Sequence, residues 1–264
     1  MIITVDSVYT HIQTDNRDIL LVLSDKFRFR PKGYQYMPHY KTGNWDGYIK
    51  VFDIANKIIH SGLLPMVLDL IDRMEEEYTI HYIHKHLELE FENYSLPFDL
   101  YDYQEEAIRY IMKNDRVLCL SPTGSGKSVI IYNLIRQWEK IEGKTLLIVP
   151  NITLINQMSK DFVEYSKGDD TFDKNSFHCI QGGKEKNADV DVYISTWQSL
   201  LQVVKKNDLE GYWEQFSSVI VDEAHQAGSK AIMSIMERLN DCPRRVGLTG
   251  TLSSSDMKVS AMQL

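Results

Sequence analysis

VLCLSPTGSGKSVIIYNLI, residues 117–135, joins a strand, a loop and a helix in one short segment. β-favouring apolar residues run up to Ser121, and from Lys127 onward the apolar residues recur at helical spacing. The loop from Ser121 to Ser128 fits the phosphate-binding pattern G-x-x-x-x-G-K-[ST] at every position except the first, where serine replaces glycine. The alternative, an ordinary turn with a stray lysine, explains neither the preceding strand nor the following helix.

The residue types of this loop suit a nucleoside triphosphate and its magnesium ion. Gly124 and Gly126 lack a Cβ atom, so the backbone can curl and direct N–H groups at phosphate oxygens. Lys127 can place a positive charge near the β- and γ-phosphates, and the Ser128 hydroxyl can bind Mg²⁺. The helix that begins here directs the positive end of its dipole at the anion. The predicted binding residues are Thr123, Gly124, Ser125, Gly126, Lys127 and Ser128.

A second group of candidate residues lies in SSVIVDEAH, Ser217–His225. An apolar strand ends there with two acids, about 95 residues after the phosphate-binding loop. Asp222 can hold Mg²⁺ directly or through water, and Glu223 can orient and deprotonate an attacking water molecule. Two acids at a strand end can also occur by chance, but their combination with a phosphate-binding loop favours a hydrolytic site that includes Lys127.

Composition excludes several classes of protein. The 264 residues are 43% apolar, enough for one large or two ordinary domains with real cores. No apolar run approaches the roughly 20 residues of a membrane span, and the N-terminus lacks a secretion signal. Cys119, Cys179 and Cys242 show no paired spacing. We therefore expect a cytoplasmic protein with reduced core thiols, whose net charge of −8 taken alone argues against a polyanionic partner.

Residues 1–98 are expected to form a small domain, and residues 26–50 of it, KFRFRPKGYQYMPHYKTGNWDGYIK, are basic and aromatic. Basic residues neutralise phosphates and exposed aromatic rings stack on bases. The candidate nucleic-acid contacts are therefore Lys26, Arg28, Arg30, Lys32, Lys41, Trp45 and Lys50. Alternatively, the aromatic residues form the core of a small sheet and the cations its solvated face. Whether Trp45 stacks on a base, separates strands or lies in the core stays open.

The same domain contains less specific segments. We predict strands at 2–5, 8–12, 26–30 and 79–91, a helix within 62–78 and a linker at 92–99. Residues 18–24 are too short and apolar to assign. His84 and His86 would share one face of a strand, but without a third ligand we expect an ordinary surface strand rather than a metal site.

From Leu100 onward, predicted helices alternate with predicted strands. The helices are 102–113 and 151–165 besides the one in the opening segment, and the later strands are 145–149, 190–195, 218–222 and 245–248. This alternation predicts an α/β fold with a mostly parallel, doubly wound sheet. Ligands in such sheets bind at the carboxyl ends of the strands.

The ordered motifs of residues 100–252 resemble the first motor lobe of superfamily 2 helicases, which implies one RecA-like lobe that uses ATP and Mg²⁺. The motifs are the phosphate-binding loop, Leu147–Pro150 with Leu154 and Gln157, Ser195–Gln198, Asp222–His225 and Gly247–Thr251. The resemblance implies that Tyr101 and Gln104 contact adenine and that Thr249 and Thr251 couple the nucleotide site to strand movement. It also implies that His225 joins Glu223 to that coupling. Loops around Pro150 and Thr196 are implied to touch the nucleic-acid backbone.

The segments GYQYMPHY and TGNWDGYIKVFD resemble the N-terminal domain of the UvsW-type DNA helicases of tailed phages. This resemblance implies an ATP-dependent enzyme that remodels branched DNA in fork regression, junction migration, recombination and repair, in the cytoplasm of a host cell. Two alternatives stay open: an ATP-driven translocase on duplex DNA or RNA, and a non-enzymatic DNA-binding module with a vestigial nucleotide site.

The superfamily also implies a second motor lobe, whereas this sequence stops at Leu264, soon after Thr251. We expect the chain alone to bind ATP and Mg²⁺ weakly and to hydrolyse ATP slowly or not at all, because the second lobe supplies arginines to the γ-phosphate.

Overall fold

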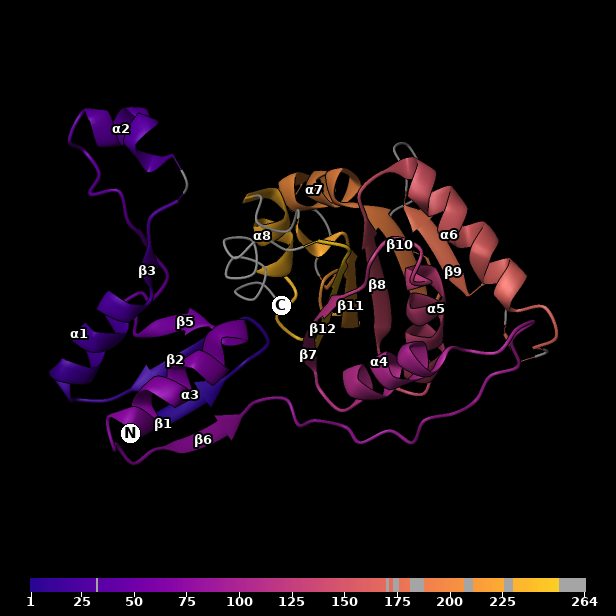
Figure 1. Cartoon of the computed structure of the whole chain (residues 1–264), viewed down its shortest axis with the longest axis horizontal. Coiled ribbons are helices and arrows are strands. Elements are labelled where there is room, and N and C mark those ends of the chain that lie inside the picture. The colour runs from indigo at the N-terminus through magenta and orange to yellow at the C-terminus, as the bar shows by residue number, and fades with distance from the viewer. Residues whose placement is uncertain are drawn as a thin grey trace. The chain divides into compact units, whose positions relative to one another are not determined.

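The computed structural model divides into two compact units, Met1–Ile83 and His84–Leu264 (Figure 1). The structure describes residues 1–31, 33–169, 171–172, 176–180, 188–206, 211–225 and 230–251. Lys32, a predicted nucleic-acid contact, lies outside this part of the chain. We predicted a domain boundary after residue 98, whereas residues 84–98 group with the second unit in the structure.

The first unit is a small α+β domain built on a four-stranded sheet of order β5-β2-β1-β6. β1 pairs antiparallel with β2 and parallel with β6, and β2 pairs antiparallel with β5. The strands are β1 (Ile2–Val5), β2 (Tyr9–Gln13), β5 (Ile58–His60) and β6 (Thr79–Tyr82), and the longer helices are α1 (Arg17–Lys26) and α3 (Leu64–Arg73). The core combines apolar residues of strands and helices: Ile3, Val5, Ile12, Ile19, Leu23, Val67 and Ile71.

Two elements of this unit differ from the prediction. The unassigned residues 18–24 lie within α1, where Asn16 accepts a hydrogen bond from the Asp18 N–H at 3.0 Å and caps the helix. The predicted strand 79–91 is only β6, because its partner β1 offers four residues for pairing. His84 and His86 therefore follow the strand, and the described residues contain no group of three or more histidines, cysteines or acids that could hold a metal ion.

The basic and aromatic segment has little regular structure. Its elements are β3 (Arg28–Phe29), η1 (Tyr34–Tyr36), α2 (Pro38–Lys41) and β4 (Ile49–Lys50). β3 pairs antiparallel with β4 over two residues, so the predicted five-residue strand at 26–30 is wrong. Phe27 is buried, whereas Tyr36 is 72% exposed, and the aromatic residues thus divide between core and surface.

The second unit contains a six-stranded sheet of order β7-β12-β11-β8-β10-β9, in which every pair is parallel. Its strands are β7 (Arg116–Leu120), β8 (Lys144–Val149), β9 (Phe177–Ile180), β10 (Val192–Thr196), β11 (Phe216–Asp222) and β12 (Arg244–Thr249). Its helices are α4 (Asp102–Met112), α5 (Lys127–Trp138), α6 (Ile152–Tyr165), α7 (Trp197–Lys206) and α8 (Lys230–Met236). The predicted parallel sheet is confirmed, and it is typical of a RecA-like lobe.

Each face of this sheet carries its own core, which makes the sheet doubly wound. Along β8, Leu147 and Val149 pack with α4, α5 and α6, whereas Leu146 and Ile148 pack with α7 and α8 (Figure 1). Successive strand residues point to opposite faces, so a strand buried on both sides reads as a continuous apolar run. This is why the sequence identified β8 and β11.

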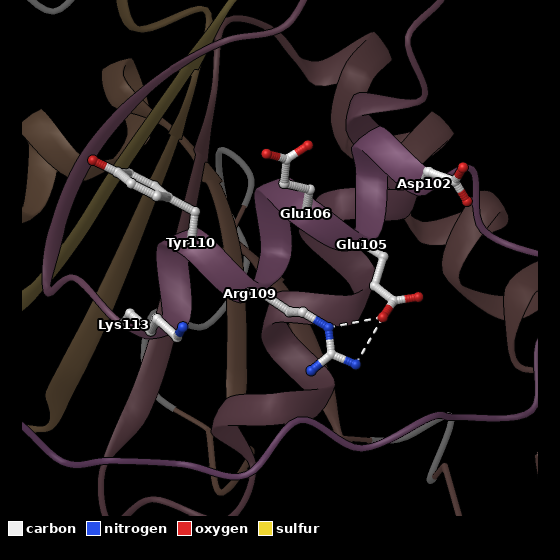
Figure 2. A pocket seen from close by; sticks show the side chains of 6 residues that line it. All are labelled: Asp102, Glu105, Glu106, Arg109, Tyr110 and Lys113. Atoms are coloured by element: carbon white, nitrogen blue, oxygen red, sulfur yellow. Dashed lines mark hydrogen bonds and ion pairs between the residues drawn. The ribbon is translucent and has the colours of Figure 1, made fainter.

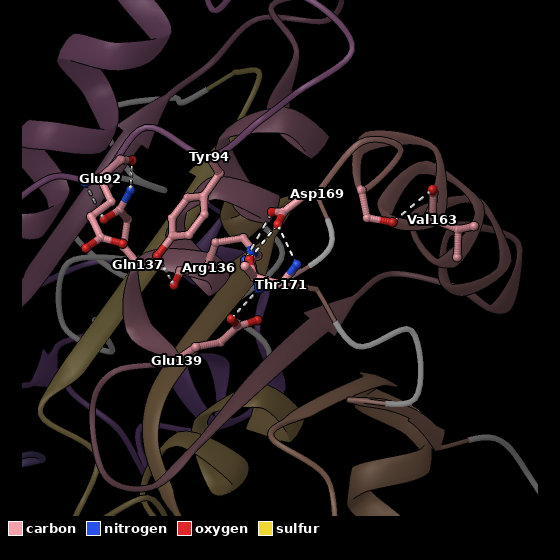
Figure 3. A network of polar contacts seen from close by, with 9 residues as sticks. Glu92, Tyr94, Arg136, Gln137, Glu139, Val163, Asp169 and Thr171 are labelled. Carbon is pink, nitrogen blue, oxygen red and sulfur yellow. Dashed lines mark hydrogen bonds and ion pairs between the residues drawn. The ribbon is translucent and has the colours of Figure 1, made fainter.

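The predicted linker at 92–99 is bonded to α5 instead of running free (Figure 3). The Glu92 N–H donates to Gln137 Oε1 at 3.1 Å, and Gln137 Nε2 donates to the Glu92 carbonyl at 2.7 Å. The Tyr94 ring lies 4.4 Å from the guanidinium carbon of Arg136, which is itself 2% exposed and paired with Asp169 at 3.1 Å. These contacts fix the segment to the second unit.

The three cysteines are free thiols, as predicted, but only Cys242 is fully buried, and Cys119 and Cys179 are half-buried. Burial raises the pKa of the Cys242 thiol to about 12. Within the described residues, no helix combines the length and the apolar content needed to span a membrane.

Candidate functional site

The phosphate-binding loop lies between β7 and α5, and glycine is required at one of its turns. Gly126 has a φ of +78°, and a Cβ atom there would lie 2.3 Å from Gln104 Nε2. Gln104 comes this close because its Nε2 donates to the Ser125 carbonyl at 3.0 Å, while its Oε1 accepts from the Tyr101 N–H at 3.1 Å. The predicted adenine contact Gln104 therefore also braces the loop from α4.

The one departure from the phosphate-binding pattern, Ser121, stabilises the loop. Its hydroxyl lies 2.5 Å from the Ser125 hydroxyl, which in turn donates to the Pro122 carbonyl at 2.7 Å. The Ser121 N–H donates to the Thr249 carbonyl at 2.8 Å and ties the loop to the end of β12. Replacing glycine by serine thus adds a hydrogen bond across the loop.

The predicted catalytic residues meet at the carboxyl ends of β7, β12 and β11, which are neighbours in the sheet. Lys127 Nζ lies 2.5 Å from Glu223 Oε1, although 96 positions separate the two residues. Glu223 follows the last residue of β11 with a φ of +53°, in the left-handed region that few residues other than glycine adopt. This turn lets Asp222 and Glu223 point in different directions.

Asp222 has the properties of a cation ligand. Its side chain is 6% exposed, and its Oδ1 atom has no hydrogen-bond partner within the described part of the chain. Burial raises the pKa of Asp222 above its ordinary value, and the nearby positive charge of Lys127 opposes this rise. A buried carboxylate oxygen without a partner is costly, and a hard cation such as Mg²⁺ prefers such an oxygen. The residues present therefore fit the predicted metal.

The predicted coupling residues form a chain of contacts with this centre. His225 Nδ1 lies 3.3 Å from Glu223 Oε2 and 2.9 Å from Thr249 Oγ1. The Thr249 hydroxyl donates to the Thr251 carbonyl at 3.1 Å. One imidazole thus touches both the candidate base and the residue at the end of β12.

Two further residues near the loop were not predicted. Tyr103 donates its hydroxyl proton to the Ser125 carbonyl at 3.1 Å, and its ring is nearly parallel to that of Tyr101, with centroids 5.6 Å apart. Tyr101, the predicted adenine contact, is 67% exposed and presents a flat ring to solvent. Tyr165 of α6 places its hydroxyl 2.8 Å from Ser128 Oγ. The aromatic character of residues 101–103 could have indicated Tyr103, but nothing in the sequence indicates Tyr165.

A pocket on the outer face of α4 is separate from these residues (Figure 2). Glu105 and Arg109 form an ion pair of 2.7 Å across its wall. The lining residues are Asp102, Glu105, Glu106, Arg109, Tyr110 and Lys113. None of them is a predicted site residue, so this hollow is not part of the candidate nucleotide site.

Two family models match the chain. The family described as "Type III restriction enzyme, res subunit" (ResIII) matches residues 97–254. The family described as "DNA helicase UvsW, N-terminal" matches residues 3–82. The chain belongs to the ResIII family of superfamily 2 helicases. Its first unit is a UvsW-type N-terminal domain.

Individual relatives agree with this assignment. The ATP-dependent DNA helicase uvsW of Enterobacteria phage T4 is 31% identical over 97% of this chain and 52% of that protein, so the chain spans about half of its length. The DNA 3'-5' translocase XPB2 of Sulfurisphaera tokodaii is 31% identical over 67% of the chain and 38% of that protein. A crystal structure of the UvsW helicase from bacteriophage T4 matches with a TM-score of 0.79 and 29% identity, covering 99% of this chain and 98% of the other.

The motor-lobe loops that the superfamily 2 helicase resemblance assigns to nucleic acid follow neighbouring strands. Pro150 follows β8, and Thr196 ends β10, which pairs with β8. The Thr196 side chain is buried, and its Oγ1 accepts a hydrogen bond from the Ser199 N–H at 3.3 Å. Nucleic-acid contact by these loops stays a prediction.

In the UvsW-type domain, the predicted cations lie on the surface. Lys26, Arg28, Arg30, Lys41 and Lys50 are all exposed. The guanidinium carbon of Arg30 lies 4.7 Å from the Tyr34 ring centroid and 4.4 Å from that of Tyr48. Arg28 also stacks on Tyr48 at 4.5 Å and pairs with Asp25, while Lys50 Nζ lies 3.9 Å from Asp46 Oδ2. The rings of Tyr34 and Tyr48 thus hold Arg28 and Arg30 in place.

Trp45 contributes to the turn in which it lies. Its Nε1 donates to the Tyr48 carbonyl at 2.8 Å, and its ring is half-buried. This contact fixes the ring edge. A role for Trp45 in binding nucleic acid stays a prediction.

Proposed function

We propose that this chain is the nucleotide- and DNA-binding portion of an ATP-dependent DNA helicase or translocase that remodels branched DNA. The observation that carries the proposal is the 2.5 Å contact between Lys127 and Glu223 beside the buried Asp222. The DNA helicase relative and the match of residues 3–82 support DNA as the partner. The exposed cations on stacked aromatic rings support binding through the first unit.

The residues divide the work of ATP hydrolysis among them. Ser128 and Asp222 would hold Mg²⁺, which neutralises charge on the β- and γ-phosphates. Lys127 exchanges its ion pair with Glu223 for the phosphates, because a triphosphate carries more negative charge than one carboxylate. Glu223 is then free to orient and deprotonate the attacking water. His225 links that carboxylate to Thr249 and transmits the change toward Thr251.

Full turnover depends on a second motor lobe in this proposal. We expect the 264-residue chain to bind ATP with Mg²⁺ weakly and to hydrolyse it slowly, with or without DNA. A steady-state ATPase assay tests this expectation. Brisk turnover stimulated by DNA would contradict the need for a second lobe.

The test of the substrate is equilibrium binding of the chain to labelled four-way junction, fork, duplex, single-stranded DNA and RNA duplex over a salt series. The salt dependence counts neutralised phosphates, and the ratio of affinities reports the preferred shape. We expect tighter binding to junction and fork than to plain duplex. Equal binding to all forms would contradict branch recognition, and preference for RNA would identify an RNA remodeller.

A point variant assigns that binding to the first unit. Arg30→Ala should weaken binding to every DNA form and lower the salt slope by about 1, as expected for one phosphate contact. Arg17→Ala removes another exposed cation from the same unit and is the matched control. Identical slopes for the two variants would argue against Arg30 as a contact.

The variant Lys127→Ala, made in the whole protein, distinguishes an ATP-dependent enzyme from a non-enzymatic DNA-binding module. This variant should keep DNA affinity and lose strand remodelling, because it removes the charge that meets the phosphates. Survival of cellular function with Lys127→Ala would instead favour a vestigial nucleotide site.

A further inference from the structure

The Ser125 carbonyl of the phosphate-binding loop accepts two hydrogen bonds from the first turn of α4. The Tyr103 hydroxyl donates to this oxygen at 3.1 Å, and Gln104 Nε2 donates to it at 3.0 Å. A carbonyl oxygen has two lone pairs, so the two donors satisfy it completely. The Ser125 carbonyl is therefore held toward α4.

The direction of this carbonyl also sets the direction of the next N–H group. A trans peptide is planar, and its C=O and N–H bonds point in opposite directions. Because the Ser125 carbonyl is turned toward α4, the Gly126 N–H points away from that helix. No residue in the described part of the chain accepts a hydrogen bond from this N–H, which leaves it available to a ligand.

The loop alone does not fix the orientation of the 125–126 peptide. Turning this peptide over changes ψ of Ser125 and φ of Gly126, and glycine adopts either sign of φ. The loop contacts of Ser125 hold other parts of the residue, since its N–H donates to the Pro122 carbonyl at 3.1 Å and its hydroxyl donates to the same oxygen at 2.7 Å. The donors on α4 are thus the contacts that act on the peptide itself.

We propose that Tyr103 is a positioning residue of the phosphate site. Its hydroxyl, together with Gln104, orients the 125–126 peptide so that the Gly126 N–H meets a phosphate oxygen. The Tyr103 ring is supported for this role by the Tyr101 ring, with an angle of 10° between the two planes. The proposal rests on the proposed function, in which the loop binds the phosphates of ATP.

The test uses inorganic pyrophosphate, which carries no base, so contacts with adenine do not enter. Pyrophosphate is titrated into the 264-residue chain in buffer with Mg²⁺, and binding is followed by NMR. Tyr103→Phe removes the hydroxyl and keeps the ring, so it should weaken pyrophosphate binding about 5-fold, the size of one net hydrogen bond. The matched control is Tyr110→Phe, an exposed tyrosine on the same helix, which should leave the affinity unchanged.

A spectroscopic signature reports the orientation of the peptide. Serine with a ¹³C carbonyl and glycine with ¹⁵N, supplied in cell-free synthesis, label only the two Ser–Gly peptide bonds of the chain, Ser61–Gly62 and Ser125–Gly126. Pyrophosphate should move the Gly126 amide proton downfield, because that proton then donates to an anion. In Tyr103→Phe the Ser125 carbonyl signal should move upfield without ligand, and the pyrophosphate shift should be smaller. The Ser61–Gly62 signal is the internal reference.

The possible results distinguish this proposal from the proposed function. Unchanged pyrophosphate affinity in Tyr103→Phe, with a Gly126 response in the unmodified chain, would overturn the proposal and leave the proposed function intact. A weaker affinity with an unmoved Ser125 carbonyl signal would also overturn it, because the hydroxyl would then act elsewhere. Absence of any Gly126 response to pyrophosphate in the unmodified chain would count against the proposed function itself.

Discussion

At the scale of single residues, Gly126 carries the strictest steric requirement of the nucleotide site. Gly126→Ala should lower the free energy of unfolding by about 2 kcal/mol, because the methyl group both occupies a left-handed conformation and displaces Gln104 from the Ser125 carbonyl. Gly124→Ala is the matched control, since its φ is +83° but nothing lies within 4 Å of an added Cβ. Urea unfolding measures both variants. Equal losses would show that the contact with Gln104 adds nothing.

Burial of the Asp222 carboxylate, the proposed cation ligand, lowers the stability of the fold. Its raised pKa means that the penalty for burying the charge is absent below the unfolded value of 3.8 and complete above the folded value. Asp222→Asn should therefore raise the unfolding free energy near neutral pH by about 1 kcal/mol, or the melting temperature by about 2–4 °C, and abolish the Mg²⁺ effect on nucleotide affinity. Glu223→Gln should not stabilise, because it breaks the ion pair with Lys127. A lower melting temperature for Asp222→Asn in metal-free buffer would contradict this account.

At the scale of elements, the turn between β1 and β2 depends on Asp6. Its Oδ1 accepts from the Val8 and Tyr9 N–H groups at 2.6 Å, and its Oδ2 lies 2.9 Å from His11 Nε2. Burial opposes ionisation, yet these hydrogen bonds to the carboxylate hold the pKa of Asp6 below its ordinary value.

Asp6→Ala should destabilise the first unit by about 2 kcal/mol at neutral pH, because two backbone donors lose a charged acceptor. A carboxylate with a lowered pKa contributes fully above the unfolded value of 3.8 and loses its contribution as the pH falls through the folded value. The difference between Asp6→Ala and the unmodified chain should therefore shrink below about pH 4. Hydrogen exchange of the β1 and β2 amides measures it, with the exposed Asp15→Ala as control. A difference that is constant over this range would exclude the ionised carboxylate as its source.

Strands buried on both faces were predicted from their composition. β8 and β11 are continuous apolar runs because each lies inside a sheet covered by helices on both faces, so that nearly every residue is buried and apolar. β9 was missed because it lies at the sheet edge, and three of its four residues are only half-buried. The length of β6 was overestimated because alternation continues past Tyr82, whereas the pairing partner does not.

At the scale of the whole molecule, chain order and strand order together explain which site residues could be found. Lys127 and Glu223 were predicted to meet because both follow parallel strands, and the carboxyl ends of parallel strands lie at one edge. Tyr165 could not be predicted, because its contact with Ser128 depends on how α6 packs against α5. No local sequence pattern indicates how these two helices pack.

The division into units gives a last prediction, since the segment 84–98 belongs with the second unit. Leu89, Phe91 and Leu96 pack against the core beneath α4 and α5, and the Arg109 guanidinium carbon lies 3.9 Å from the Phe91 ring centroid. A chain that begins at residue 84 should therefore unfold at higher urea concentration than one that begins at residue 99, by about 3 kcal/mol of unfolding free energy.

In the full chain, Phe91→Ala should cause part of the same loss, which excludes an effect of the new terminus alone. Removing residues 1–83 should leave the affinity for the fluorescent nucleotide mant-ADP unchanged. The hydrogen bonds that hold the phosphate-binding loop come from residues 101–249. Equal stability of the two shortened chains would place the functional boundary after residue 98 and make the contacts of Tyr94 and Glu92 with α5 energetically neutral. A large difference in stability would instead mean that residues 84–98 are a structural part of the motor lobe. The hinge for any movement of the first unit would then lie before His84.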